Sequence, residues 1–298
     1  MSTTISLATG RPYGIQRVCA VWDESRSTFY TRKARQESSA PAAPCKRGPK
    51  TLLSDDELLD LIRDDLATSP FTGEGHRKVW ARLRFVKGHK VGRKRVLRIM
   101  REQHLLSPHR VPQGKPQLHE GKIITYAPNV MWGTDGTKIF TLEDGWCWLF
   151  TAVEHWNSEC VGWHVAKTGD RFAALQPISM GLMKHYGSVH AEAARGLTLR
   201  MDNGSQYLSE HFQNQIKFWG IAPSFAFVRE PETNGVVERF NRTIKEQVIY
   251  GRIFRTIEDV RSAMAEFVKL YNKLWLVEKM GFKSPSQARE QFNFKEAA

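Results

Sequence analysis

The chain of 298 residues and 34.2 kDa is long enough for two or three domains of ordinary size. Hydrophobic residues make up 41% and aromatic residues 11%, which excludes wholesale disorder and a coiled-coil fibre. The longest apolar stretch, Trp146–Phe150, is far shorter than the roughly 20 residues of a membrane span, and no secretory signal is expected. Four cysteines without a CxxC pair suit a reducing compartment, so we expect a cytoplasmic protein.

The charge of the chain is unevenly distributed. Lys and Arg number 44 against 31 Asp and Glu, and residues 1–122 alone hold 24 of the basic and 12 of the acidic side chains. A basic front half before a near-neutral remainder indicates a polyanion-binding module joined to a second part. A membrane surface is the alternative partner, but no basic amphipathic helix with a broad apolar face is visible. We therefore expect nucleic acid as the partner, and no membrane.

Residues 1–50 indicate an N-terminal helical segment followed by a basic linker. A helical pattern covers Ile15–Glu24, and Arg35–Pro49 is rich in Ala, Pro, Ser, Gly and basic residues, as linkers are. Ser54 and Glu57 then have the spacing of a capping box, which marks the start of a helix. The first domain boundary is therefore expected near residue 50.

Residues 51–106 predict a small helical DNA-binding domain. One helical pattern follows Ser54, and two further short ones follow turns that contain glycine. Three short helices with tight turns are typical of a helix-turn-helix bundle. A solvated charged face is the alternative for its basic residues, but so many like charges would repel one another without a counter-charge. The residues expected to contact DNA are Arg77, Lys78, Arg82, Arg93, Lys94, Arg95 and Arg98.

Residues 107–124 read as a second linker with several Pro and Gly, and residues 125–298 predict an α/β domain. Three consecutive strands are expected at Val130–Phe140, Trp146–Val153 and Cys160–Ala166. Helices and strands then alternate, with helices at Phe172–Lys184, Glu210–Trp219 and Gly235–Ile249, strands at Leu197–Met201 and Ser224–Phe227, and a last helix at Ile257–Tyr271. This order predicts a mixed sheet flanked by helices.

Three carboxylates fall at the edges of these elements. Asp135 lies inside the apolar run of the first strand, and Asp202 directly follows the strand that ends at Met201. Glu238 lies in the first turns of the helix that begins at Gly235. A lone strand-end Asp is usually a turn former or a helix cap, which is the alternative for each. Three carboxylates in one sheet domain would instead suit a hard cation such as Mg²⁺, which takes a few oxygen ligands and keeps several waters.

Two strings around these acids resemble a known family. They are Asp202-Asn203-Gly204-Ser205-Gln206-Tyr207 and Asn234-Gly235-Val236-Val237-Glu238-Arg239, with 35 residues between Asp202 and Glu238. Both are similar to the Asp–Asp–Glu catalytic core of retroviral integrases and bacterial insertion-sequence transposases. The basic strings Gly75–Trp80 and Arg93–Met100 look like the helical module of those transposases whose upstream and downstream reading frames are fused by frameshifting. The chain resembles their downstream, catalytic product.

The resemblance implies an RNase H-like fold and a DNA transposase. Asp135, Asp202 and Glu238 would be the catalytic residues and the ligands of two Mg²⁺ ions, which Mn²⁺ would replace, and Asp135 would bridge them. The enzyme would cleave the ends of an insertion sequence and transfer their 3′-hydroxyls to target DNA. A non-catalytic DNA-binding regulator and an RNase H-type metal-dependent nuclease are the alternatives.

The helix that carries Glu238 adds a basic face. Asn241, Arg242 and Lys245 follow Glu238 at spacings that share its face, where they would hold the phosphates beside the cleaved bond. A helical ion pair between Glu238 and Arg242 is the alternative. The expected partners are the element's terminal repeats, target DNA, further copies of the chain and the upstream-frame product. Association with the nucleoid would follow.

Two departures from the family pattern are visible. Gly136 follows Asp135 where the family commonly has an apolar β-branched residue. The zinc-binding His/Cys domain of retroviral integrases has no counterpart, because His104 and His109 have no cysteine pair near them in the sequence. We interpret these histidines as structural or close to DNA.

Overall fold

The computed structural model describes residues 3–37, 52–108, 123–226 and 235–296, and it divides into a unit of residues 1–52 and a unit of residues 53–298. The first unit contains α1 (Ile15–Val21) and α2 (Arg26–Glu37). Ser25 caps α2, because its hydroxyl accepts the N–H of Thr28 at 3.2 Å. The sequence did not predict a helix over most of α2. The last turn of α2 extends into the expected linker, and the rest of that linker lies outside the described residues.

The expected three-helix bundle forms in residues 53–108. It consists of α3 (Asp55–Thr68), α4 (His76–Ala81), a π-helical continuation η1 (Arg82–Val86), and α5 (Arg93–Glu102). The capping box at the start of α3 is confirmed, with Glu57 N–H donating to Ser54 Oγ and Ser54 N–H to Glu57 Oε2. Leu58, Ile62 and Met100 are fully buried in its core. The linker expected after it lies mostly outside the described residues.

A mixed five-stranded sheet forms the centre of residues 123–296. Its strands are β1 (Met131–Thr141), β2 (Gly145–Glu154), β3 (Cys160–Ala166), β4 (Thr198–Met201) and β5 (Ala222–Phe225). The order across the sheet is β3-β2-β1-β4-β5. β2 is antiparallel to both of its neighbours, β1 and β3, whereas β4 and β5 run parallel to β1. β5 begins two residues before the expected Ser224. The sequence prediction of a mixed sheet is confirmed.

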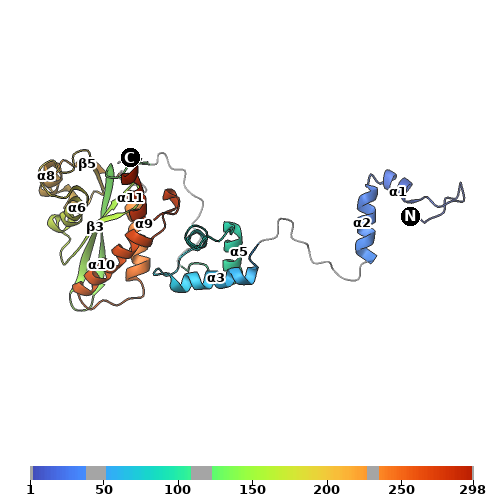
Figure 1. Ribbon diagram of the computed structural model, residues 1–298, viewed down its shortest axis with the longest axis horizontal. Coiled ribbons are helices and arrows are strands. Elements are labelled where there is room, and N and C mark those ends of the chain that lie inside the picture. Colours follow the sequence, from blue (N-terminus) through green and yellow to red (C-terminus); the bar gives the residue numbers. More distant parts are fainter. Residues whose placement is uncertain (1–2, 38–51, 109–122, 227–234, 297–298) are drawn as a thin grey trace. The chain divides into compact units, whose positions relative to one another are not determined.

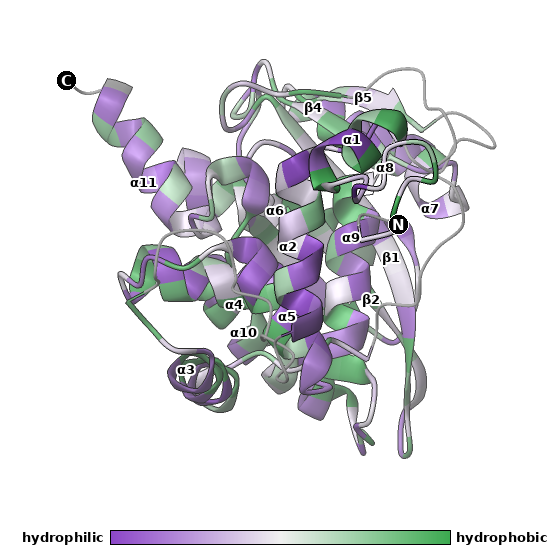
Figure 2. Ribbon diagram, turned by 90° about the vertical axis from the view of Figure 1, so that its right-hand side faces the viewer, coloured by the Kyte–Doolittle hydropathy of each residue, from purple (hydrophilic) through white to green (hydrophobic). Residues whose placement is uncertain are grey.

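Helices cover both faces of this sheet (Figure 1). They are α6 (Arg171–Tyr186), α7 (Ser205–Leu208), α8 (Glu210–Phe218), α9 (Gly235–Ile244) with its π-helical end η3 (Lys245–Ile249), α10 (Ile257–Leu274), η4 (Glu278–Met280) and α11 (Pro285–Glu296). Three of them, α7, η4 and α11, were not expected from the sequence. Figure 2 shows hydrophilic and hydrophobic residues alternating along α11.

Alternation of side chains along β1 and β2 divides the core into two layers. Even-numbered residues such as Trp132 and Phe150 pack with α6 and α8. Odd-numbered residues such as Ile139 and Leu149 pack with α9 and α10. Asp135 is odd-numbered, so the sheet directs it toward α9. In the part of the chain that is described, no helix is long and apolar enough to cross a membrane.

Candidate active site and nucleic-acid interface

The pairing of β1 with β4 brings two of the three predicted carboxylates together. Trp132 lies opposite Leu199, and Gly133 lies opposite Arg200. Continuing this parallel register by two residues places Asp135 opposite Asp202, and neighbouring strands lie about 4.8 Å apart. Burial, together with the charge of Asp202, raises the pKa of Asp135 above its usual value. The two carboxylates therefore act on each other directly.

Helix α9 holds the Asp135 carboxylate in place. The Asn241 amide donates to Asp135 Oδ2 at 2.8 Å, and its Oδ1 accepts the Thr151 hydroxyl at 3.1 Å. The Gly136 N–H donates to Asp135 Oδ1 at 2.7 Å. Asn241 is buried, so its amide orients a carboxylate inside the protein. Sequence spacing had grouped it with phosphate contacts, and Thr151 had not been singled out at all.

Glu238 lies one helical turn before Asn241 on α9. The i, i+3 spacing puts both residues on the same helix face, and the Glu238 side chain is exposed. Among the described residues, no group of three or more His, Cys, Asp or Glu side chains is gathered as a metal site. Asp202 thus follows the strand next to β1, which carries Asp135, and Glu238 lies on the helix that packs against β1.

Lys245 and Arg242 extend this face of the helix. Lys245 begins η3 and is close enough to Asp135 for its positive charge to lower the pKa of that carboxyl. Arg242 lies in the last turn of α9 and is exposed to solvent. Lys245 therefore brings positive charge close to Asp135, and Arg242 lies on the same helix.

Tyr207 is a buried residue of the site that sequence reasoning did not assign. It lies in α7, directly after the turn in which Asp202 Oδ1 accepts the Gly204 N–H at 2.9 Å. Burial and the charges of Asp135 and Asp202 raise the pKa of the Tyr207 phenol well above its usual value. Tyr207 therefore lies close enough to both carboxylates for their charges to act on it. The only sequence signal was its place in the string that begins at Asp202.

Four of the predicted DNA-contact residues in the helical bundle form hydrogen bonds with acidic side chains. Arg82 forms hydrogen bonds with Asp65 and Glu74, and both of these acids are buried. Arg95 and Arg98 both bind Asp55, at 2.8 and 2.5 Å, and these hydrogen bonds lower the pKa of Asp55 to about 2. Arg77 binds Glu278 at 2.8 Å. These ion pairs supply the counter-charge that the sequence alone did not reveal.

The remaining three basic residues are placed differently. Arg93 lies 3.7 Å from Glu278, and the Lys78 ammonium lies 3.1 Å from the centre of the Trp275 ring. Lys94 is exposed near the start of α5. Within the described residues, no ion pair or ring contact is found for Lys94.

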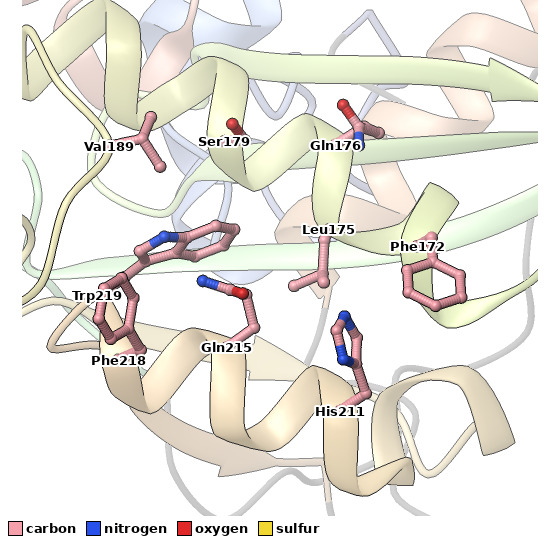
Figure 3. Close-up of a pocket in the computed structure, with 9 residues that line it drawn as sticks. All are labelled: Phe172, Leu175, Gln176, Ser179, Val189, His211, Gln215, Phe218 and Trp219. Atoms are coloured by element: carbon pink, nitrogen blue, oxygen red, sulfur yellow. The ribbon is translucent and has the colours of Figure 1, made fainter.

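A pocket of about 380 Å³ lies between α6 and α8 (Figure 3). Phe172, Leu175, His211 and Trp219 are among the residues that line it. None of the predicted site residues contributes to this lining. The pocket is therefore separate from the candidate active site.

Comparisons with known proteins agree with this arrangement. Residues 125–231 and 219–285 match family models described as "Integrase core domain", and residues 54–113 match one described as "HTH-like domain". The transposase InsD for insertion element IS2A/D/F/H/I/K of Escherichia coli is 30% identical over 228 residues, 73% of this chain and 73% of that protein.

Two solved structures are also similar. The catalytic core domain of BIV integrase matches with a TM-score of 0.41 and 20% identity, over 57% of this chain and 99% of that chain. A chain of the simian T-cell lymphotropic virus intasome in complex with PP2A regulatory subunit B56 gamma matches with a TM-score of 0.41 and 18% identity. This second match covers 75% of this chain and 70% of that chain.

The HTH-like domain followed by the integrase core and its mixed sheet define a protein of the integrase-core class. Within that class, the chain belongs to the family of insertion-element transposases. The family and the fold expected from the sequence are thereby both confirmed.

Proposed function

We propose that this chain is the enzyme that cuts the ends of an insertion sequence and joins their 3′-hydroxyls to target DNA. The observation that carries the proposal is that Asp135 lies in β1 and Asp202 directly follows the neighbouring parallel strand β4, with α9 packed against β1. Family membership supports it, because the similar Escherichia coli proteins are named transposases.

A divalent cation suits this set of ligands. Asp135 and Asp202 offer hard oxygen atoms, and a cation between them would offset the repulsion that contributes to the raised pKa of Asp135. We assign Asp135, Asp202 and Glu238 as the ligands of Mg²⁺ in a two-ion site, with Mn²⁺ as a substitute. Such ions activate the attacking hydroxyl and stabilise the leaving oxygen in phosphodiester transfer.

The chain's own residues would position the carboxylates and the DNA. Asn241 fixes the rotamer of Asp135 through the hydrogen bond to Oδ2. Arg242 and Lys245 supply positive charge for the phosphates on either side of the reacting bond. In the helical bundle, Lys94 and Arg93 are the exposed cations nearest the start of α5, where a phosphate would be contacted.

Each domain of the chain would have its own function in this reaction. Residues 51–106 would bind element ends, residues 107–124 would link the domains, and residues 125–298 would carry the catalytic site. Because two element ends must be joined together, at least two copies of the chain would act on DNA, with the upstream-frame product as a fusion or partner. The enzyme would work in the cytoplasm, on the nucleoid.

Charge-removing variants test the catalytic assignment. Asp135→Asn, Asp202→Asn and Glu238→Gln each keep the size of the side chain, so each should abolish end cleavage and strand transfer while DNA binding is retained. Each should also reduce the rise in melting temperature caused by Mg²⁺ or Mn²⁺. A cation bound only to the folded protein stabilises it by about 2.7 kcal/mol at a hundred times its Kd.

The products of the reaction distinguish the alternatives. Purified protein is incubated with element-end duplex, target plasmid and Mg²⁺, and joined molecules are expected. Hydrolysed ends without joined molecules would identify a nuclease, and binding without either product would identify a regulator. If one variant joins DNA at the unmodified rate, that residue does not belong to the catalytic set.

A further inference from the structure

The tip of the hairpin formed by β1 and β2 has one covered and one uncovered face. Odd-numbered residues near the tip, such as Ile139 and Cys147, are buried against the layer that contains α10. On the opposite face, Phe140 is 52% exposed and Trp146 is 61% exposed. The open face of an antiparallel hairpin normally carries polar side chains, so an aromatic surface here calls for a partner.

The aromatic rings on this face are arranged in successive pairs across the two strands. Phe140 lies opposite Trp146, with ring centres 5.4 Å apart in an edge-to-face arrangement. In the next pair, Lys138 lies opposite Trp148, and its ammonium is 4.9 Å from the centre of the Trp148 ring. Aromatic side chains and a cation thus alternate along the same face.

The inner ring of this surface is held rigidly. Trp148 stacks on the buried Phe150, with ring centres 5.8 Å apart and planes 7° from parallel. The backbone at Gly169 lies against Trp148 so closely that a Cβ atom there would come within 2.3 Å of the ring. A fixed ring next to two exposed rings gives a preformed surface, so little conformational entropy is lost when a flat ligand stacks on it.

The charges around the rings favour an anionic partner. Lys138 is exposed, and the Lys167 side chain is 71% exposed. The two acids of the hairpin turn are already engaged, because Glu143 binds Arg255 at 2.7 Å and Asp144 accepts the Ile257 N–H at 2.9 Å. Lys167 lies 3.8 Å from Asp144, so only part of its charge is compensated. Aromatic rings with adjacent cations are the surface that unpaired nucleotides require.

The same strand connects this surface to the carboxylate pair. Pairing of β1 with β4 ends at Gly133, and in the described part of the chain the next contact on that side is the bridge from Thr141 to Phe254. Asp135 lies at the start of this interval and Phe140 near its end. Five residues of extended chain span roughly 17 Å. Asp135 faces α9 and Phe140 projects from the opposite face, so a DNA strand would pass from one to the other across the edge of β1 in this interval.

We propose that Phe140, Trp146 and Trp148, together with Lys138, form a stacking platform for unpaired nucleotides of the DNA strand that passes Asp135. The position of that strand rests on the proposed function, whereas the affinity of the platform for unpaired bases does not. Unpaired bases are specified because paired bases keep their flat faces inside the duplex, where protein rings do not reach them.

Binding of two DNA probes tests the platform directly. The full chain is titrated in EDTA with fluorescein-labelled oligothymidylate or with a labelled blunt duplex, and anisotropy reports the affinity. The double variant Phe140→Ala/Trp146→Ala should bind oligothymidylate roughly tenfold more weakly, because stacking accounts for on the order of 1–3 kcal/mol per base. Binding of the blunt duplex should change less than about twofold, since stacking rather than charge is removed.

Two single variants serve as controls. Leu142→Ala removes an apolar side chain that is 61% exposed at the same tip, and Phe294→Ala removes an aromatic one that is 79% exposed on α11. Both should bind oligothymidylate as the unmodified chain does. Equal losses for both probes, or a loss in the Leu142→Ala control, would overturn the platform.

Two further measurements distinguish a nucleotide platform from a protein interface, and the platform from the catalytic site. If the double variant changes the sedimentation of the protein but not its affinity for oligothymidylate, the surface is a protein interface and the proposal is wrong. Asp135→Asn should leave oligothymidylate binding intact because it lies outside the platform. If this variant also transfers strands normally, the proposed function fails while the platform stands.

Discussion

At the scale of single residues, helical spacing alone does not distinguish whether Asn241 contacts a DNA phosphate or holds a carboxylate within the protein. Spacing from Glu238 correctly places Asn241 on the same face of α9, but it does not show that β1 packs against this face. In the structure, the amide donates to Asp135 and its oxygen accepts from Thr151. Both ends of the Asn241 side chain are therefore used within the protein.

Replacing Asn241 should affect both stability and catalysis. Asn241→Leu keeps the size but leaves Asp135 and Thr151 without this partner, which should lower the free energy of unfolding by about 1–3 kcal/mol. The pKa of Asp135 should rise further, because the hydrogen bond from Asn241 lowers it. The rate of strand transfer should fall in the same variant. Urea unfolding and transfer rates measure the two effects.

Thr151→Val is the matched control for this prediction. It removes the hydrogen bond to Asn241 Oδ1 and leaves the bond to Asp135 in place. We expect a stability loss of about 1 kcal/mol with transfer largely retained. If Asn241→Leu and Thr151→Val reduce transfer equally, orientation of Asp135 is not the function of the amide.

Gly136 shows why a departure from a family pattern needs the structure. The sequence shows only that the β-branched residue is missing. In the sheet, Gly136 lies opposite the buried Phe150, and a Cβ atom at this position would come within 2.7 Å of the Phe150 ring. Phe150 therefore occupies the space that a side chain at residue 136 would need. Glycine at position 136 therefore leaves room for the Phe150 ring, and Asp135 remains part of β1.

At the scale of elements, periodicity predicted the strands and long helices because their burial follows from alternation or helical repeat. The strand at Cys160–Ala166 matches its prediction, and α10 extends three residues beyond the expected helix. α11 was missed because it is held largely by polar contacts with distant residues. α7, with four residues, is too short for a periodic signal. The sequence predicted acidic residues at the edges of these elements, but it did not predict the register in which β1 pairs with β4.

The main polar anchor of α11 is Arg289. It donates to Glu159 Oε2 at 2.5 Å and to Asn129 Oδ1 at 3.2 Å. Lys184 from α6 binds the other oxygen of Glu159 at 2.7 Å. Burial would raise the pKa of Glu159, but the His185 imidazole 3.5 Å from its Oε1 and the charges of Arg289 and Lys184 outweigh burial and hold that pKa well below 4.5.

The stability supplied by this anchor should depend on pH. Because the pKa of Glu159 is depressed in the folded chain, its contribution is complete above about pH 4.5 and is lost as the pH falls below that value. Arg289→Met should lower the free energy of unfolding by about 3 kcal/mol at neutral pH, since it removes one partner of a buried pair. The difference from the unmodified chain should shrink in acid, as urea unfolding across the pH range would show.

The double variant Arg289→Met/Glu159→Gln tests the cause of this loss. Removing the Glu159 charge together with Arg289 should recover part of the stability at neutral pH, because Glu154, 3.5 Å from Arg289, is then the one buried carboxylate of the two that still lacks this partner. If the double variant is less stable than Arg289→Met and the loss does not change with pH, packing of α11 rather than charge explains the anchor.

At the scale of the unit formed by residues 53–298, the helical bundle packs against the C-terminal part of the catalytic region. Phe71, which follows α3, lies edge-to-face with Trp275 at 4.9 Å. The N–H of Thr72 donates to Gln247 Oε1, and Gln247 returns a hydrogen bond to the Thr72 carbonyl. Phe282 stacks on Phe85 with ring centres 5.8 Å apart. The partners are far apart in sequence, so local patterns did not predict them.

This contact engages two arginines that we expect to bind DNA. Glu278 binds Arg77 at 2.8 Å and lies 3.7 Å from Arg93, so its carboxylate occupies the place that a phosphate would take. Glu278→Gln should therefore increase the affinity for duplex DNA and steepen the dependence of log K on log salt by about 0.9 for each phosphate gained. The free energy of unfolding should change by less than about 1 kcal/mol, because these ion pairs are exposed.

The control must remove one negative charge without freeing these arginines, and Glu258→Gln does so. Glu258 is an exposed acid on α10 that pairs with Arg261 at 2.5 Å, so its loss changes the net charge by the same amount. General attraction of DNA to a more positive protein would strengthen binding in both variants alike. Competition between Glu278 and phosphate predicts the larger gain for Glu278→Gln. Adding Arg77→Ala to Glu278→Gln should cancel that gain, and a gain that persists would show that Glu278 does not compete with DNA for Arg77.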